Sequence, residues 1–201
     1  MKTKLLVAAA VLALPVVAVR ADFLPLDPGT GIIYYTSNSN DGYSSYRGVV
    51  FEADEAIVVT GAGLYTKSTG GLNANFRLWE VIYTHGNVYD GATLVRDFDA
   101  VLQGDLGFHD GTCDPYTLIP GQAYLLQVGY AESADENWFF DFDPDMFGHD
   151  PVDIGAVTLI DGTLGGDTGN YVMPFMELAY VPAPGAFALL GLGLFGVRRR
   201  R

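Results

Sequence analysis

An alternating run of aspartates in the stretch DFDPDMFGHDPVD could bind a hard cation. Asp141, Asp143 and Asp145 recur at every second residue, and Asp150 follows shortly after. Calcium takes about six to eight oxygen ligands, and a strand that runs into a loop can supply them from carboxylates and backbone carbonyls. The stretch is not an EF-hand loop, because Met146 stands where that loop needs glycine. Two interpretations stay open: a calcium site, or a solvated acidic edge that discourages pairing with another sheet.

Trp79, in the stretch FRLWE, is the candidate for contact with a sugar. Sugars stack on exposed aromatic rings, and the chain carries 12 tyrosines and two tryptophans. On a strand, Trp79 would share a face with Arg77 and Val81, opposite Phe76 and Leu78. Each face carries one charged residue, Arg77 on the first and Glu80 on the second, so the sequence does not decide which face is buried. Trp79 is therefore either part of a carbohydrate-binding surface or an aromatic residue of the core.

The sequence contains no arrangement typical of an enzyme's active site. No serine stands in a Gly-x-Ser-x-Gly elbow, and 24 acidic residues form carboxylate pairs by chance alone. His109 and Cys113 are four residues apart, but Gly111 and Thr112 between them favour a turn over a zinc site. Because Cys113 is the single cysteine, no disulfide forms within the chain. We expect a protein that is not an enzyme and that has no cofactor beyond the candidate calcium ion.

Short runs rich in β-branched and aromatic residues predict the elements that position these side chains. The predicted strands are 31–36, 46–52, 56–66, 74–83, 92–101, 122–130, 137–142, 154–160 and 171–180. The clearest run is QAYLLQVGY, in which the two-residue period of a strand places Tyr124, Leu126, Val128 and Tyr130 on one face.

Glycine-containing turn signals separate these runs and indicate the fold class. They include Gly70-Gly71, Asp90-Gly91, Pro120-Gly121 and Asp161-Gly162, and the stretches GDLGFHDGTCD and DGTLGGDTGN have the composition of loops. No amphipathic helical pattern interrupts the series. We therefore predict an all-β, antiparallel β-sandwich of jelly-roll-like form, flanked by an N-terminal signal helix and a C-terminal apolar helix.

The chain begins with the pattern of a secretory signal peptide. Lys2 and Lys4 precede an apolar run, and the small residues Val19 and Ala21 fit a cleavage site. Pro15 and the shortness of the apolar run argue against a permanent membrane anchor. We expect residues 1–21 to be removed on export.

The chain ends in an apolar segment followed by four arginines. Arg198, Arg199, Arg200 and Arg201 follow a stretch, 178–197, that contains no charged residue. This stretch has about the minimum length of a transmembrane helix, and the arginines would stay on the cytoplasmic side. Only residues 185–197 are free of proline, so the tail is a weak stop-transfer signal that would hold the exported body outside.

Together these features resemble the PEP-CTERM family of sorting signals. The resemblance rests on a proline-x-proline triplet, an apolar Gly/Leu-rich segment and a terminal arginine cluster, with a signal peptide at the other end. The family's Pro-Glu-Pro is Pro182-Ala183-Pro184 in this chain, so the acidic residue is missing. The resemblance implies export, transient membrane association and processing by an exosortase-like membrane protease. The alternative is a C-terminal anchor that is never cut.

Between the two ends, residues 22–181 form one predicted domain that is strongly acidic. This body retains four basic residues against all 24 acidic ones, a formal charge of −20. Such a charge repels nucleic acid, so we exclude a nucleic-acid partner. The segments AIVVTGAGLYT, FRLWE and LIPGQAYLLQVGY are similar to a β-sandwich module of unknown function in other PEP-CTERM proteins. We expect an exported structural or adhesive protein of the cell surface or extracellular matrix, or alternatively a carbohydrate-binding module with an extracellular polysaccharide as partner.

Overall fold

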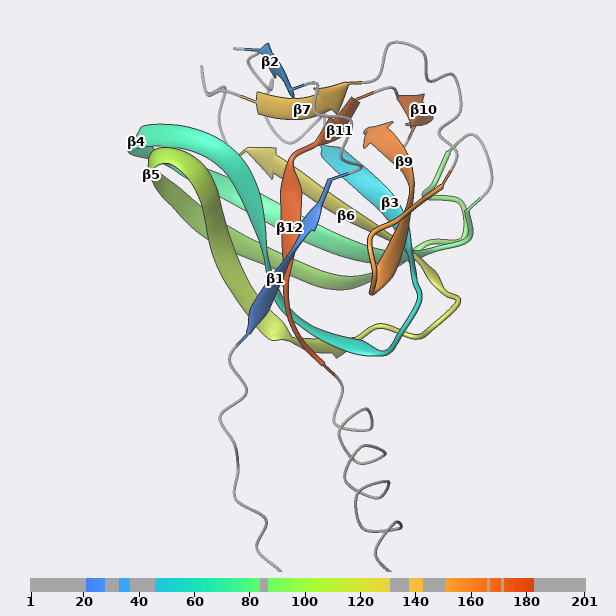
Figure 1. Ribbon diagram of the computed structural model, residues 1–201. Helices are drawn as coiled ribbons and strands as arrows, with labels where there is room; N and C mark the ends of the chain where they lie inside the picture. Colours follow the sequence, from blue (N-terminus) through green and yellow to red (C-terminus); the bar gives the residue numbers. More distant parts are fainter. Residues whose placement is uncertain are drawn as a thin grey trace, which may run out of the picture.

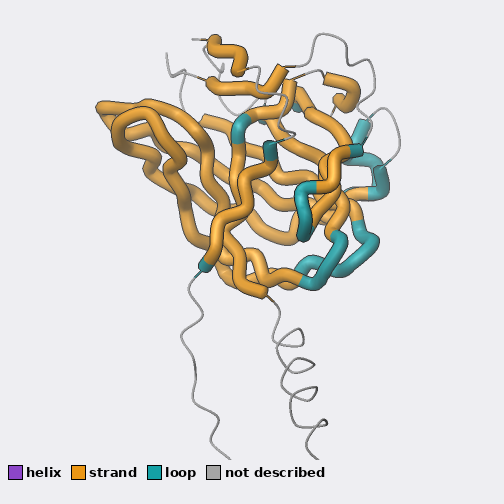
Figure 2. The backbone as a smooth tube through the Cα atoms, in the orientation of Figure 1, coloured by secondary structure: helices purple, strands orange, loops and turns teal. Residues whose placement is uncertain are grey.

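The computed structural model describes residues 21–27, 33–36, 46–83, 87–130, 138–142, 151–165, 167–170 and 172–182. This part of the chain consists of strands and short connections, and Figure 2 shows no helix in it. All strand pairs there are antiparallel. The prediction of an all-β, antiparallel body is confirmed.

The described strands follow one another in the order seen in Figure 1. They are β1 (Asp22–Leu26), β2 (Ile33–Thr36), β3 (Arg47–Ala53), β4 (Ile57–Val81), β5 (Thr93–Thr117), β6 (Ala123–Tyr130), β7 (Trp138–Phe142), β8 (Val152–Asp153), β9 (Val157–Leu164), β10 (Asp167–Asn170), β11 (Val172–Pro174) and β12 (Met176–Pro182). Strand β1 was not predicted from the sequence, because its five residues include a proline and follow directly on the signal segment.

Most of these strands form one strongly curled sheet with the shape of a half-barrel (Figure 1). Its order is β1-β12-β4-β6-β3-β9-β10, with β5 paired to β4 and β8 paired to β9. Strands β11, β7 and β2 form a second, three-stranded sheet at the top of Figure 1. The curl brings the two arms of the large sheet toward each other and creates an inner and an outer face.

The curl originates in the β4–β5 hairpin, whose strands have 25 residues each. The first part of β4 pairs with β12 and the last part with β6, while β5 follows β4 along its other edge. The predicted turn at Gly70-Gly71 is therefore wrong. These glycines lie inside β4, where Gly71 has a φ of 82° and the register shifts. The glycine pair bends the strand without reversing it, because β5 continues to pair alongside.

Two further stretches with loop composition are also strand. GDLGFHDGTCD lies within β5, and Asp161-Gly162 lies within β9, where Asp161 pairs with Val50 of β3. Pairing with a neighbouring strand overrides the weak local preference of glycine and aspartate for turns. The predicted turns at Asp90-Gly91 and Pro120-Gly121 are confirmed, and Gly91 and Gly121 have the positive φ values that favour glycine.

The main core fills the inner face of the curled sheet. Tyr124, Leu126, Val128 and Tyr130 of β6 are all buried there, which confirms that they share one face. Residues of the other strands complete this core, among them Val49, Phe51, Ile57, Leu64, Phe76, Leu78, Leu102, Leu159 and Leu178. The side of β4 that carries Phe76 and Leu78 is thus the inner one. Trp79 lies on the outer face.

The body begins and ends on adjacent strands at one end of the molecule. Asp22 of β1 pairs with Tyr180 of β12, and Pro182, the last residue of β12, pairs with Ile57 of β4. Both strand ends lie at the bottom of Figure 1, opposite the three-stranded sheet. Pro182 is therefore the first residue of the proline-x-proline triplet and also part of the sheet. The remaining predicted sorting residues (Ala183, Pro184, Arg198, Arg199, Arg200 and Arg201) and residues 1–20 lie outside the described residues.

Candidate functional site: the outer face of the sheet

A small second apolar cluster lies on the outer face of β3, β4 and β6. It consists of Val50, Val81, Val88 and Leu125, all buried. Val88 belongs to the connection between β4 and β5, which folds back over the sheet. The outer face is therefore partly covered rather than fully solvated.

Trp79 packs against this cluster and is half-buried. The ring of Tyr89 lies 5.3 Å from the indole ring, tilted by 51°. The indole Nε1 is buried and has no hydrogen-bond partner among the described residues. Trp79 is therefore neither a freely exposed platform for a sugar nor a residue of the main core, and its role in sugar binding stays a prediction.

The connection that covers Trp79 is fixed by a buried glutamine. Gln127 of β6 is fully buried, and its Nε2 donates to the backbone carbonyl of Gly165 at 2.8 Å. The same amide is hydrogen-bonded to the hydroxyl of Tyr89, with 2.8 Å between Nε2 and Oη. An unpaired buried amide would cost about 1–3 kcal/mol, so these bonds stabilise the covering segment.

A polar network occupies the neighbouring part of the outer face. The hydroxyl of Tyr46 donates to Asn75 Oδ1 at 2.7 Å, and Asn75 Nδ2 donates to Asp97 at 2.7 Å and to Asp99 at 2.9 Å. The guanidinium of Arg77 lies 4.3 Å above the ring of Tyr46, and its Nε is 3.5 Å from the Asp97 carboxylate. Because the ring of Tyr46 is covered by Arg77, this network is not an open aromatic surface.

A shallow hollow of about 350 Å³ opens on the same face, where β3 and β4 end and β6 begins. Its lining residues are Glu52, Val81, Ile82, Tyr83, Gly121, Gln122, Ala123 and Ile160. The hydroxyl of Tyr83 donates to Asp161 at 3.0 Å, and burial together with the Asp161 carboxylate raises the pKa of Tyr83 to about 12. The tyrosine that lines the hollow is therefore neutral at physiological pH.

The sequence did not point to this hollow. Glu52 and Ala123 lie at the ends of predicted strands, where alternation gives their face but not their depth. The available signal was the outward position of Ala123 beside the inward Tyr124. A small side chain there leaves room above the sheet only if its neighbours on the adjacent strands are larger, and those neighbours are set by the register.

A buried carboxyl group lies on the opposite arm of the curled sheet. Glu177 of β12 is 5% exposed and sits over Gly63, where a Cβ would lie 2.7 Å from Oε1. Burial and, to a lesser extent, the nearby charge of Asp110 raise the pKa of Glu177 to about 7. This group is an acid whose charge changes near neutral pH.

The candidate calcium residues are only partly covered by the structure. Asp141 belongs to β7, where it pairs with Ile33 and Met173, while Asp143, Asp145 and Asp150 lie outside the described residues. Within the described ranges, no three His, Cys, Asp or Glu side chains are grouped so that they could hold a metal ion. The calcium site stays a prediction.

His109 and Cys113 lie in β5 rather than in the predicted loop. His109 Nε2 is 2.8 Å from the carbonyl of Asp105. Cys113 is half-buried against the main core, and burial raises the pKa of its thiol. A raised pKa disfavours the thiolate, which is the nucleophilic form.

The chain matches no known family model, and no curated protein is significantly similar to it. In the part of the chain that the structure describes, no helix is long and apolar enough to cross a membrane.

Proposed function

We propose that this protein is an exported structural or adhesive component of the cell surface or extracellular matrix, and that it is not an enzyme. The observation that carries the proposal is the position of the two ends of the body. Asp22 and Pro182 lie on adjacent strands at the same end of the molecule. A body attached to a membrane through the segment after Pro182 would therefore present its opposite end and its outer face to the surroundings.

The resemblance to PEP-CTERM sorting signals supplies the route in this proposal. The export machinery removes residues 1–21, and an exosortase-like membrane protease recognises the tail 182–201 during a transient membrane association. The charge of −20 on the body disfavours binding of the body itself to nucleic acid and to anionic lipid.

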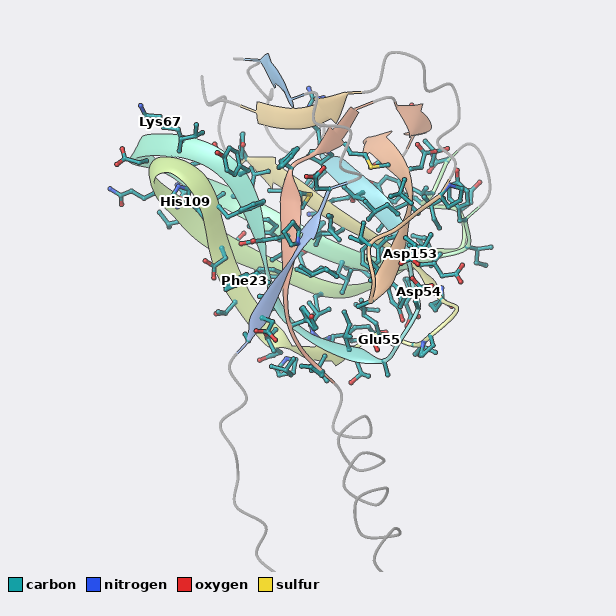
Figure 3. The ribbon with its side chains drawn as sticks, viewed as in Figure 1. Phe23, Asp54, Glu55, Lys67, His109 and Asp153 are labelled. Carbon is teal, nitrogen blue, oxygen red and sulfur yellow. The ribbon has the colours of Figure 1, made fainter. Side chains whose placement is uncertain are left out.

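Intact mass and cell fractionation of the protein from its native host test this route. The mass reports both cleavages, and fractionation separates membrane, surface and matrix. We expect replacement of Arg198–Arg201 by serine to release or misplace unprocessed protein, because a short apolar segment holds poorly without cytoplasmic charges. Lys67→Ser, which removes an exposed cation from the body, is the control (Figure 3). Unchanged mass and location of the tail variant would refute the proposal.

We also propose that the curled sheet is a jelly-roll-like sandwich flanked by a signal helix and an apolar C-terminal helix. The bend of the β4–β5 hairpin supports a two-layered arrangement. A Cβ placed on Gly111, in the second part of β5, would lie 2.5 Å from the Cβ of Ala100 in the first part.

Carbohydrate binding is the second candidate function, with an extracellular polysaccharide as partner. The hollow beside Tyr83 favours it, because apolar side chains such as Ala123 and Ile160 line it together with polar ones such as Glu52 and Gln122. Trp79 lies on the same face but is not among the residues that line the hollow. Calcium bound near Asp141 would be compatible with either function.

A further inference from the structure

We propose that the hollow on the outer face binds a protonated amino-sugar residue of an extracellular polysaccharide. This inference rests on the second proposed function, carbohydrate binding, and names its site and its ligand class. It does not depend on Trp79 or on the C-terminal tail.

The shape of the hollow follows from one row of residues across three strands. Val81 of β4 pairs with Ala123 of β6, and Ala123 pairs with Glu52 of β3. Since neighbouring strands lie about 4.8 Å apart, Val81 and Glu52 stand about 10 Å apart with the small alanine between them. The ring of Tyr83 and the side chain of Ile160 border this dip. Its width suits one sugar ring, and its volume is at the lower end for ligand sites.

The hydrogen-bond donors of Gly121 and Gln122, in the turn that borders the hollow, already bond to carbonyl groups of the protein. Gln122 Nε2 donates to the carbonyls of Val81 and Ala123, at 3.0 and 2.9 Å. The backbone N–H groups of Gly121 and Gln122 donate to the carbonyls of Ala53 and Ile119. What the Gln122 side chain still offers is its Oε1, which is an acceptor. A ligand at this margin must therefore bring donors of its own.

The opposite margin carries a negative charge. Glu52 is half-buried, and its carboxylate has no hydrogen-bond or ion-pair partner within the described residues. Tyr83, which also borders the hollow, is neutral. The hollow thus offers acceptors on two sides and one negative charge, with the small side chain of Ala123 between them. Anionic sugars are disfavoured here, both by Glu52 and by the charge of the body.

An amino sugar fits these groups better than a lysine side chain does. A pyranose ring places an apolar C–H face over Ala123 while hydroxyl and ammonium donors point outward from its rim. It can therefore reach Glu52 and Gln122 at the same time. A lysine has donors only at the tip of its stem, so it would use one margin and leave the other unpaired.

Isothermal titration of the purified full chain tests the proposal. The probe is a fully deacetylated chitosan tetramer at mildly acidic pH, where its amines are protonated, and the N-acetylated tetramer serves for comparison. Glu52→Gln removes the charge with little change of shape, and Ala123→Leu fills the dip. Glu55→Gln makes the same chemical change at an exposed acid in the turn between β3 and β4, which is labelled in Figure 3.

We expect Glu52→Gln and Ala123→Leu each to weaken binding of the amino tetramer by about tenfold. Glu52→Gln removes one charged hydrogen bond, and Ala123→Leu fills the space that the sugar ring would occupy. Glu55→Gln should stay within about twofold of the wild type, as for an exposed charge. Equal weakening by Glu52→Gln and Glu55→Gln would overturn the proposal, since attraction by the overall charge would then suffice. Tighter binding of a lysine-rich peptide would also overturn it.

The comparison with the N-acetylated tetramer separates this proposal from carbohydrate binding in general. Equal or tighter binding of the N-acetylated form, with loss in Ala123→Leu, would reject the amino-sugar specificity but keep a sugar site in the hollow. Failure of both tetramers to bind would reject the amino-sugar site. Binding of another, neutral polysaccharide that is insensitive to Ala123→Leu would then retain carbohydrate binding at a different place.

Discussion

At the scale of single residues, Asn75 has the most demanding position on the outer face. Its one amide group donates to both Asp97 and Asp99 while its carbonyl accepts from Tyr46. We expect Asn75→Asp to destabilise the fold by about 2–3 kcal/mol at neutral pH, because a third carboxylate would replace the shared donor. Urea unfolding measures the change.

The matched control for this variant is Asn73→Asp, an exposed position on the same strand. It adds the same charge without touching the network, so its effect should stay within about 0.5 kcal/mol. In acid, where a protonated carboxyl group can donate a hydrogen bond, the penalty of Asn75→Asp should shrink. Equal penalties for the two variants would show that the network contributes nothing beyond the overall charge.

Glu177 should make the stability of the body depend on pH. Its pKa is raised from 4.5 to about 7 in the folded state, so the folded protein binds more protons than the unfolded chain between these values. The stabilisation is therefore present at pH values below about 4.5 and is lost as the pH rises through about 7. The loss amounts to at most about 3 kcal/mol for a shift of this size.

The variant Glu177→Gln tests this dependence because it keeps the shape and stays neutral. Unfolding measured at pH 5 and pH 8 should show a smaller difference for the variant than for the wild type, and a more stable variant at pH 8. Glu55→Gln, at an exposed carboxyl, should keep the wild-type difference. An unchanged pH dependence in Glu177→Gln would assign the effect to other groups.

The alternation of side chains between the two faces of a strand was the most predictable feature of the chain. The common face of Tyr124, Leu126, Val128 and Tyr130 follows from the strand period alone. The face of Trp79 could not be predicted, because both sides of that strand carry apolar and charged residues. Burial of Glu177 is also invisible in the sequence, since it results from Gly63 lying beneath it across the register.

At the scale of elements, the bend of the β4–β5 hairpin depends on a glycine. A Cβ on Gly111 would lie 2.5 Å from the Cβ of Ala100, which is closer than non-bonded carbon atoms approach each other. We expect Gly111→Ala to cost about 1–3 kcal/mol through overpacking. Thermal or urea unfolding of the variant measures the cost.

A second substitution shows whether the cost arises at that contact. Ala100→Gly in the same chain should restore part of the stability, a coupling that only neighbouring residues show. Gly107→Ala is the control within β5, because the nearest atom to its added Cβ is 4.0 Å away. If Gly107→Ala were as costly as Gly111→Ala, the general effect of replacing glycine by alanine in this strand, and not the bend, would explain the cost.

The lengths of the elements were less predictable than their existence. Most predicted runs overlap observed strands, but the sequence divides β4 at its glycine pair and ends β5 near Val101. Glycine and aspartate favour turns locally, yet each of these strands has a long partner whose hydrogen bonds outweigh that preference. The hollow was unpredictable for the same reason: it depends on strand pairing, because the register sets which residues lie beside Ala123.

At the scale of the whole molecule, the excess of acidic residues should make the body sensitive to cations. We expect calcium to raise the melting temperature more than sodium at matched ionic strength if the aspartate run binds it. At one hundred times the dissociation constant the stabilisation would be about 2.7 kcal/mol. Asp141→Asn combined with Asp143→Asn should remove the excess. Equal shifts from both salts would leave only general screening of charge.

The adjacent ends of the body also decide how it would respond to mechanical force. If the chain is held beyond Pro182 and pulled through a ligand on its outer face, the load runs along β12. This strand is paired with β1 on one side and with β4 on the other. Such a load shears both ladders at once, so many hydrogen bonds must break together. Pulling Asp22 and Pro182 apart would instead open the β1–β12 ladder one pair at a time, at much lower force.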